Sequence, residues 1–101
     1  MPIIELNNNN FKQKVLDRKG RIVVDFKANW CGPCQMLYTV LEEDLSDDFN
    51  IASIDIDEEP ELAKQFKVSS IPCLILFENG KEIKRNVGIQ SKKFLEKWLS
   101  K

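Results

Sequence analysis

Hydrophobic residues along the chain follow two different spacings, and the change from one to the other marks the elements of the fold. Phe11, Val15 and Leu16 recur at helical spacing before Gly20, whereas residues 22–26 form a nearly unbroken apolar run. The first pattern predicts an amphipathic helix that ends at the glycine, and the second predicts a strand buried on both faces. Further along, the pattern predicts a helix over 36–45, a strand over 51–56, a helix from residue 60, strands over 73–77 and 81–87, and a last helix capped by Ser91.

The order of these elements predicts the fold class. Asn79 and Gly80 stand between the last two strands and are typical of a tight hairpin, so we expect these strands to pair antiparallel. Strands that alternate with helices, followed by a hairpin and a final helix, favour a mixed sheet with helices on both faces. No linker or internal repeat interrupts the pattern. We therefore expect an α/β fold and a single domain over residues 1–101.

Composition narrows the classes of function. The 15 basic and 16 acidic residues give a net charge of −1, which argues against a general electrostatic attraction to nucleic acid or to anionic membranes. The longest apolar runs are far shorter than the ~20 residues that span a bilayer. The N-terminal residues lack the basic and apolar regions of a signal peptide. These features favour a cytoplasmic protein that binds neither nucleic acid nor membrane.

Cysteine chemistry is the strongest candidate for an activity. The chain has three cysteines, Cys31, Cys34 and Cys73, and no histidine, which excludes Cys–His catalysis and any zinc site that needs an imidazole. A closed zinc site needs four ligands, so the three thiols would require a carboxylate to complete the set. The carboxylates within residues 55–61 are expected to form a solvated face beside a helix start rather than a metal site. We therefore expect no bound metal.

Residues 29–34 read NWCGPC, with two cysteines three positions apart. As a purely structural disulfide, the pair would close a loop of only about four residues. It would then add about 2 kcal/mol to the free energy of unfolding, the weak end of disulfide stabilisation. As a redox pair it fits its surroundings, because Cys31 falls at the N-terminus of a predicted helix, where free N–H groups and the helix dipole favour a thiolate. Pro33 suits the first helical turn, and Gly32 allows the chain to turn sharply. We therefore predict a dithiol–disulfide pair that cycles between its two states.

Three segments together resemble the thioredoxin family. VVDFKANWCGPC (23–34) is similar to its active-site strand and loop, and SIPCLILFENGK (70–81) to its isoleucine–cis-proline segment, strand and hairpin. VGIQSKKFLEKWL (87–99) resembles its closing glycine and last helix, so the resemblance covers essentially the whole chain. It implies the thioredoxin fold, a central mixed sheet of about five strands flanked by about four helices. It also implies a thiol–disulfide oxidoreductase that reduces disulfides in protein substrates.

The resemblance implies roles for individual residues. Cys31 would be the nucleophile that attacks a substrate disulfide, and Cys34 the resolving thiol that releases the reduced substrate. Gly32 and Pro33 complete the active-site loop. Asp25 would be buried, with a raised pKa, and would take the proton of the resolving thiol. The strand pattern alone leaves an alternative open, in which this aspartate ends the strand and reaches solvent.

Four more residues resemble the surface on which the family docks its substrates. Ile71, Pro72 and Gly88 match its flat apolar part. We expect Pro72 to follow a cis peptide bond, with the backbone of Ile71 free to pair with an extended substrate. Trp30 matches the tryptophan that borders and shields the thiols, although an ordinary packed aromatic residue remains an alternative.

The resemblance also implies how the protein is recharged. Electrons would come from NADPH through a flavoprotein thioredoxin reductase, since the chain itself shows no flavin or nicotinamide motif. We expect a monomer without a bound cofactor. Two other functions stay open: the same chemistry used as an oxidant or isomerase, and a non-catalytic binding module. The presence of Cys31, Cys34, Asp25 and Pro72 together argues against the module, which needs none of this chemistry.

Several positions depart from the commonest family pattern, among them Lys27, Gln35, Thr39, Ser53 and Cys73. Thr39 stands where a helix-kinking proline is frequent, so we expect a straighter helix. Lys27 stands where a tryptophan is frequent, so we expect looser packing beside the site, and Gln35 removes a frequent positive charge after the second cysteine. Ser53 stands where the family frequently has a lysine near its buried aspartate. Without that positive charge, we expect Asp25 to be harder to ionise than in relatives that have the lysine. Cys73 follows the proline, where threonine or valine is common. It either fills the same volume or adds a third thiol, open to oxidation or to a competing disulfide with Cys31.

Overall fold

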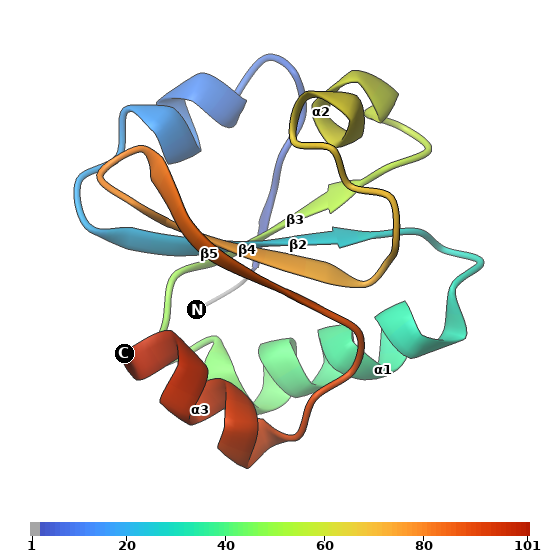
Figure 1. Cartoon of the computed structure of the whole chain (residues 1–101), viewed down its shortest axis with the longest axis vertical. Coiled ribbons are helices and arrows are strands. Elements are labelled where there is room, and N and C mark those ends of the chain that lie inside the picture. The colour runs from blue at the N-terminus through green and yellow to red at the C-terminus, as the bar shows by residue number, and fades with distance from the viewer. Residues whose placement is uncertain (1–2) are drawn as a thin grey trace.

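The computed structural model describes residues 3–101 and contains a five-stranded sheet between two layers of helices (Figure 1). The predicted α/β class and mixed sheet are confirmed. The strands are β1 (Ile4–Glu5), β2 (Arg21–Lys27), β3 (Ile51–Asp55), β4 (Cys73–Glu78) and β5 (Lys81–Val87). The helices are α1 (Gly32–Val40), α2 (Pro60–Gln65) and α3 (Lys92–Ser100), with two short π-helical segments, η1 (Lys12–Leu16) and η2 (Leu41–Leu45), of which η2 continues directly from α1.

The strands follow the order β1-β3-β2-β4-β5 across the sheet. The pairs β1–β3 and β2–β3 are parallel, whereas β4 is antiparallel to both β2 and β5. The turn at Asn79 and Gly80 therefore makes the predicted hairpin. Both residues have positive φ, 52° and 82°, a conformation that asparagine and glycine adopt more easily than other residues.

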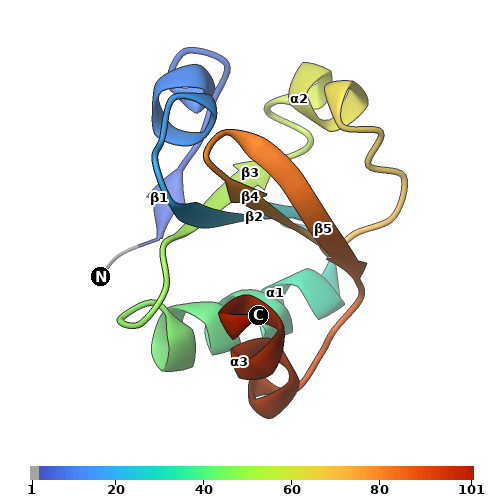
Figure 2. The ribbon, with the colours of Figure 1, turned by 60° about the vertical axis from the view of Figure 1, so that its left-hand side comes forward.

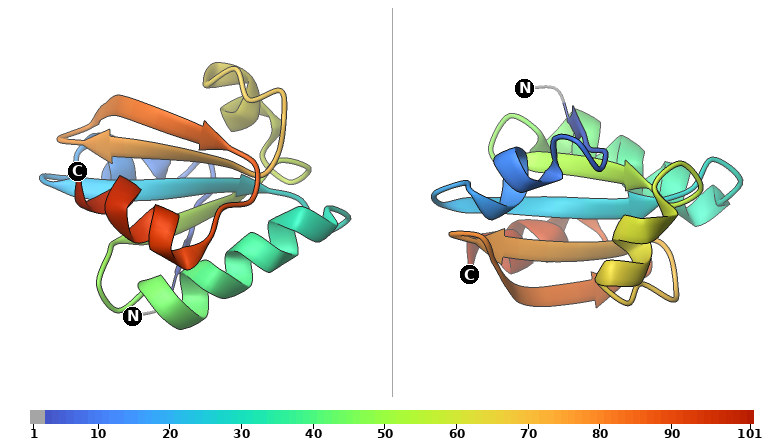
Figure 3. Two further views of the ribbon diagram at one scale, coloured as in Figure 1. Left: turned by 60° about the horizontal axis from the view of Figure 1, so that its bottom comes forward. Right: turned by 90° about the horizontal axis from the view of Figure 1, so that it is seen from above.

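Helices cover both faces of the sheet, as the sequence predicts. Figures 1 and 2 place α1, η2 and α3 on one face and η1 with α2 on the other, and the two views of Figure 3 show each layer in turn. Successive residues of β2 serve opposite layers, because side chains alternate along a strand. Val24 packs in a core with Phe11, whereas Val23 packs in a second core with Leu37 and Leu95.

This alternation fixes the direction of Asp25. It lies two residues from Val23 on β2, so it shares the face that α1 and α3 cover. In register it stands opposite Ser53 of β3 and Leu74 of β4. The fold thereby puts a carboxyl group on the sheet face beneath the helix that begins at the cysteines.

Helix starts agree with the capping residues in the sequence. The hydroxyl Oγ of Ser91 accepts a hydrogen bond from the N–H of Phe94 at 3.1 Å, so the predicted N-cap of α3 is confirmed. Pro60 is the first residue of α2, where its missing N–H costs no hydrogen bond.

Candidate active site

Cys31 and Cys34 form a disulfide at the N-terminus of α1, with their Cα atoms 5.2 Å apart. Cys31 is the N-cap residue, and Gly32 and Pro33 are the first two residues of the helix. The N–H of Cys34 donates to Sγ of Cys31 at 3.2 Å. The predicted location of Cys31 at a helix N-terminus is therefore confirmed. A thiolate at Cys31 would be stabilised by the same donor and by the helix dipole.

The two cysteines differ in exposure. Cys34 is completely buried, whereas Cys31 keeps 6% of its surface exposed. Ala28, Ile56 and Ile71 pack around the pair. Of the two residues, only Cys31 has surface that an incoming disulfide can contact.

Asp25 is a completely buried carboxyl group. It has no exposed surface, and within residues 3–101 neither of its carboxyl oxygens makes a hydrogen bond. Burial raises the pKa of Asp25 to about 7, and the positive charge of Lys27 opposes this rise. The expected burial is thus confirmed, and the alternative of a strand-end residue that reaches solvent is wrong. A carboxyl group with such a pKa exchanges protons at neutral pH.

Ser53 provides no charge to offset this burial. It lies opposite Asp25 in the pairing of β2 and β3 and is itself completely buried. In the part of the chain that the structure describes, its hydroxyl has no hydrogen-bond partner. Position 53 therefore brings no positive charge to Asp25, and the charge that opposes the effect of burial on its pKa comes from Lys27 on β2.

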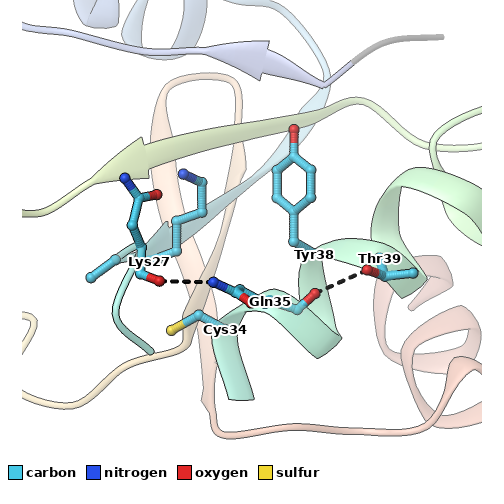
Figure 4. Close-up of a pocket in the computed structure, with 7 residues that line it drawn as sticks. Lys27, Cys34, Gln35, Tyr38 and Thr39 are labelled. Carbon is cyan, nitrogen blue, oxygen red and sulfur yellow. Dashed lines mark hydrogen bonds between the residues drawn. The ribbon is translucent and has the colours of Figure 1, made fainter. Parts of the chain in front are cut away.

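A cavity of about 290 Å³ opens beside Cys34 (Figure 4). Its walls come from the end of β2, the loop that follows and the first turns of α1. Nε2 of Gln35 donates to the carbonyl of Asn29 at 2.8 Å, and Oγ1 of Thr39 donates to the carbonyl of Gln35 at 3.1 Å. The cavity agrees with the looser packing expected where Lys27 replaces a tryptophan. Its lining residues are Lys27, Ala28, Asn29, Cys34, Gln35, Tyr38 and Thr39.

Lys27 reaches across this cavity to α1. Its Nζ lies 5.7 Å from the centroid of the Tyr38 ring, which is a cation–π contact. Figure 4 shows the side chain of Lys27, from the end of β2, and that of Tyr38, from α1, extending in roughly the same direction. No ion pair involves Lys27 within residues 3–101. The role of Tyr38 was not predicted, because nothing in the sequence links it to the end of β2.

Trp30 stands at the surface beside the disulfide. Trp30 is 70% exposed, so the alternative of an ordinary packed aromatic residue is wrong. Its indole Nε1–H donates to Oδ2 of Asp57 at 2.7 Å. The sequence pattern missed this partner, since Asp57 was counted with the solvated acidic face. The contact holds the tryptophan to the loop after β3.

The prediction that the carboxylates within residues 55–61 form a solvated face is wrong for Asp55. This residue is only 7% exposed, and its Oδ1 accepts the N–H groups of Asp57 at 2.9 Å and Glu58 at 3.3 Å. The carboxylate thereby shapes the turn that presents Asp57 to Trp30. Its position directly at the end of a buried strand was the one signal for this role.

Ile71, Pro72 and Gly88 lie together, and Ile71 connects this group to the cysteine pair. The Ile71–Pro72 peptide bond is cis, as predicted. The N–H of Gly88, which has a φ of 98°, donates to the carbonyl of Pro72 at 2.8 Å. Ile71 packs against the two cysteines. Apolar side chains near this group remain at the surface, with Val87 52% and Ile89 41% exposed.

Cys73 follows Pro72 but faces away from the disulfide. It is 1% exposed and packs in the core of the η1 and α2 layer, together with Phe26 and Ile75. It carries a free thiol, and burial raises the pKa of that thiol. The structure does not bring Cys73 into the cluster of apolar residues around Cys31 and Cys34.

Comparisons with known proteins agree with this geometry. A sequence model of the thioredoxin family matches residues 2–101. The chain is 43% identical over 100 residues to the thioredoxin of Mycobacterium tuberculosis (strain ATCC 25618 / H37Rv), covering 96% of this chain and 86% of that protein. It is 46% identical over 98 residues to the thioredoxin of Chlamydia muridarum, covering 95% of this chain and 94% of that protein.

Two further matches extend the comparison. A bifunctional thioredoxin reductase/thioredoxin of Mycobacterium leprae is 44% identical over 100 residues, which is 96% of this chain but only 22% of the length of that protein. The solved structure of a mutant thioredoxin from Halobacterium salinarum NRC-1 superposes with a TM-score of 0.88 at 32% identity. It covers 98% of this chain and 88% of that one, which confirms the thioredoxin fold.

The family match, the shared fold and the bonded cysteine pair lead to one conclusion about the chemistry. The chain belongs to the thioredoxin family, and it is a thiol–disulfide oxidoreductase that reduces protein disulfides through the reversible Cys31–Cys34 couple.

Proposed function

We propose that Cys31 is the nucleophile of this reduction, Cys34 the resolving thiol and Asp25 the group that accepts the Cys34 proton. The observation that carries the proposal is the contrast within the pair. Cys31 caps the helix and keeps exposed surface, whereas Cys34 is completely buried, in one apolar cluster with Ala28. Asp25, with its pKa of about 7, lies on the sheet face that α1 covers.

The reaction then proceeds in two exchanges. The thiolate of Cys31 attacks one sulfur of the substrate disulfide, and the other substrate sulfur leaves as a thiolate and takes up a proton. Cys34 next gives its proton to the carboxylate of Asp25, and its thiolate attacks Sγ of Cys31. The Cys31–Cys34 bond forms as the bond between Cys31 and the substrate breaks, and the second substrate sulfur leaves as a thiolate that takes up a proton from water. Two electrons pass from the dithiol to the substrate, which leaves with two thiols.

The docking surface consists of Trp30, Ile71, Pro72 and Gly88, of which Pro72 is itself buried. Exposed apolar area beside a reactive centre marks a site of protein contact. Trp30 supplies such area on one side of the disulfide, and the segment around Gly88 supplies it on another. The partners that fit this surface are disulfide-containing proteins rather than nucleic acid.

Family members carry no bound cofactor, so the electrons must come from a partner. We infer that this partner is a flavoprotein thioredoxin reductase supplied by NADPH. The relative from Mycobacterium leprae supports the pairing, because its name joins a thioredoxin reductase and a thioredoxin in one protein. We also propose a monomer that works in the cytoplasm and that folds as one domain over residues 1–101, of which residues 1 and 2 lie outside the described part. Within residues 3–101 no helix is long and apolar enough to cross a membrane.

Trapping of the mixed disulfide tests the assignment of the two thiols. The Cys34→Ser variant should accumulate a covalent adduct with insulin through Cys31, whereas Cys31→Ser should form none and should lose insulin reduction. Mass spectrometry of the trapped peptides identifies the bonded cysteine. An adduct through Cys34 or Cys73 would contradict the assignment.

A redox-buffer titration separates the reductant from the oxidant or isomerase. A reduction potential of about −270 mV, the value known for thioredoxin itself, fits a reductant, and one above roughly −200 mV fits the alternatives. A binding module would show no insulin reduction that depends on Cys31.

A further inference from the structure

We propose that Lys27 is a positioning residue for the resolving step: its ammonium group supplies the positive charge that keeps Asp25 able to accept the Cys34 proton at neutral pH. The inference rests on the proposed role of Asp25. It assigns a function to a position where the family frequently has a tryptophan, in a chain whose position 53 carries no charge.

The geometry of β2 brings the two side chains to one side of the sheet. Asp25 and Lys27 are two residues apart, so they share a face, with Cα atoms about 6.5–7 Å from each other. Lys27 lies in register with Asp55 of β3. Asp55 uses one of its carboxyl oxygens for two backbone N–H groups and makes no ion pair with Lys27 within residues 3–101.

The Tyr38 ring holds the ammonium group against α1. The cation–π contact, 5.7 Å from Nζ to the ring centroid, keeps the charge beside the cavity that Cys34 also lines. The charge of Asp25 reaches the same ring, since it contributes to a raised pKa of Tyr38 after burial, Glu42 and Glu5. The charges of Lys27 and Asp25 therefore both lie near Tyr38, in the space between β2 and α1.

No other cation faces Asp25 in the described chain. The neighbouring groups are Tyr38 from α1, Ser53 opposite Asp25 on β3 with Asp55 two residues further along, and Leu74 opposite Asp25 on β4. The Cys73 thiol, on the other face of β4, also interacts electrostatically with Asp25. Burial raises the pKa of both the Tyr38 phenol and the Cys73 thiol, so both are neutral near pH 7, and the carboxylate of Asp55 has the opposite sign to a cation. Lys27 is thus the charge that lowers the pKa of Asp25 against the effect of burial. Its charge is not cancelled, because it has no carboxylate partner within residues 3–101.

This charge matters because an acceptor works best when its pKa lies near the working pH. At pH 7 an acid with a pKa of about 7 is ionised in half of the molecules. A tenfold weaker acid would be ionised in about one tenth, a loss of roughly fivefold in the active form. Loss of the Lys27 charge should therefore slow resolution at neutral pH and leave it unchanged at alkaline pH.

The test compares Lys27→Met with Lys27→Arg, which keeps the charge, and with Lys93→Met, which removes a charge from the exposed side of α3. Two quantities are measured: the titration of the Asp25 carboxyl carbon by NMR in the oxidised protein, and the single-turnover rate of resolution from about pH 6 to about pH 9. In Lys27→Met we expect the Asp25 carboxyl group to titrate at higher pH. We also expect resolution of the mixed disulfide to be several-fold slower at pH 7. Lys27→Arg and Lys93→Met should match the wild type in both.

Further variants separate this inference from the role of Asp25 itself. If Asp25→Asn slows resolution but Lys27→Met leaves the Asp25 titration in place, the inference about Lys27 is overturned and the role of Asp25 stands. If Asp25→Asn has no effect on resolution, the proposed role of Asp25 fails instead. Adding Ser53→Lys to Lys27→Met should return the pKa of Asp25 and the rate of resolution toward the wild-type values, because it puts a positive charge on the residue opposite Asp25. A slow rate in Lys27→Met at every pH would indicate a packing effect and overturn the inference.

Discussion

Asp25 and Ser53 lie opposite each other in the parallel pairing of β2 and β3, and within residues 3–101 neither side chain has a hydrogen-bond partner. Both are completely buried. Because the hydroxyl does not stabilise the charged carboxylate, burial raises the pKa of Asp25 from 3.8 to about 7. Between pH 3.8 and about 7, Asp25 therefore keeps its proton in the folded protein but has released it in the unfolded chain, so the free energy of unfolding depends on pH.

This link predicts the pH dependence of unfolding. The raised pKa of Asp25 contributes stability that is fully present below pH 3.8 and is lost as the pH rises to about 7. The wild type should lose about 4 kcal/mol of unfolding free energy from this group over that range, whereas Asp25→Asn should lose none. Urea unfolding of both oxidised proteins at pH 4 and pH 8 measures the difference. Parallel pH dependences of the two proteins would contradict the assignment of the buried proton.

Asp25→Asn should also separate the two exchange steps. The amide cannot take a proton from Cys34, so resolution should slow by at least about tenfold, while attack by Cys31 should change little. Stopped-flow measurement of mixed-disulfide formation and decay resolves the two rates. Equal effects on both rates would show that the substitution acts through the structure of the site as a whole.

The hydrogen bond between Trp30 and Asp57 predicts an energetic coupling. Trp30→Phe removes the donor and Asp57→Ala removes the acceptor of the 2.7 Å contact. A bond to a carboxylate contributes more than a neutral one, but exposure of the tryptophan weakens it, so we expect a coupling energy of about 0.5–1 kcal/mol. A double-mutant cycle in urea unfolding measures it. Additive single effects would mean that the contact does not hold the loop in solution.

Much of the fold and the active-site loop could be predicted because their signals are local. The apolar run of β2, the Asn79–Gly80 turn and the Ser91 cap each depend on residues within a few positions of one another. The location of Cys31 at a helix N-terminus follows from the same kind of signal. The strand β1 has only two residues, which is too short to give such a pattern.

The parts that could not be predicted depend on contacts between distant segments. Trp30 and its acceptor Asp57 are 27 residues apart, and their contact requires the turn that Asp55 shapes. The contact between Lys27 and Tyr38 depends on how β2 meets α1, which hydrophobic spacing does not encode. The resemblance marked Lys27 only as a departure, and its surroundings became clear from the geometry.

Two glycines with the same backbone conformation predict different costs of substitution. Gly80 has a φ of 82° and a Cβ there would lie 2.2 Å from the carbonyl oxygen of Leu16, whereas Gly20 has a φ of 86° and open space. Gly20→Ala should cost about 1–2 kcal/mol for the left-handed conformation alone. Gly80→Ala should cost roughly 1–3 kcal/mol more, because backbone atoms must shift. Urea unfolding compares them, and equal costs would show that the hairpin moves freely away from η1.

The placement of Cys73 predicts a thiol that packs but does not react. In the reduced native protein, iodoacetamide should modify Cys31 rapidly and should reach Cys73 only after unfolding, since that residue is 1% exposed and its pKa is raised. Mass spectrometry after timed labelling measures each site. Rapid labelling of Cys73, or a Cys31–Cys73 disulfide in the oxidised protein, would support the alternative of a third redox thiol.

Matched substitutions at Cys73 then separate packing from chemistry. Cys73→Val keeps an apolar side chain beside Phe26 and Ile75, so insulin reduction and the redox potential should stay at the wild-type values, with a stability change below about 1.5 kcal/mol. Cys73→Ser puts a hydroxyl into the same apolar core and should lower the unfolding free energy by about 1–3 kcal/mol. Because the serine variant also lacks the thiol, normal reduction by both variants would assign Cys73 to the core. A lower rate in both, with stability retained in the valine variant, would instead assign the thiol a part in the exchange.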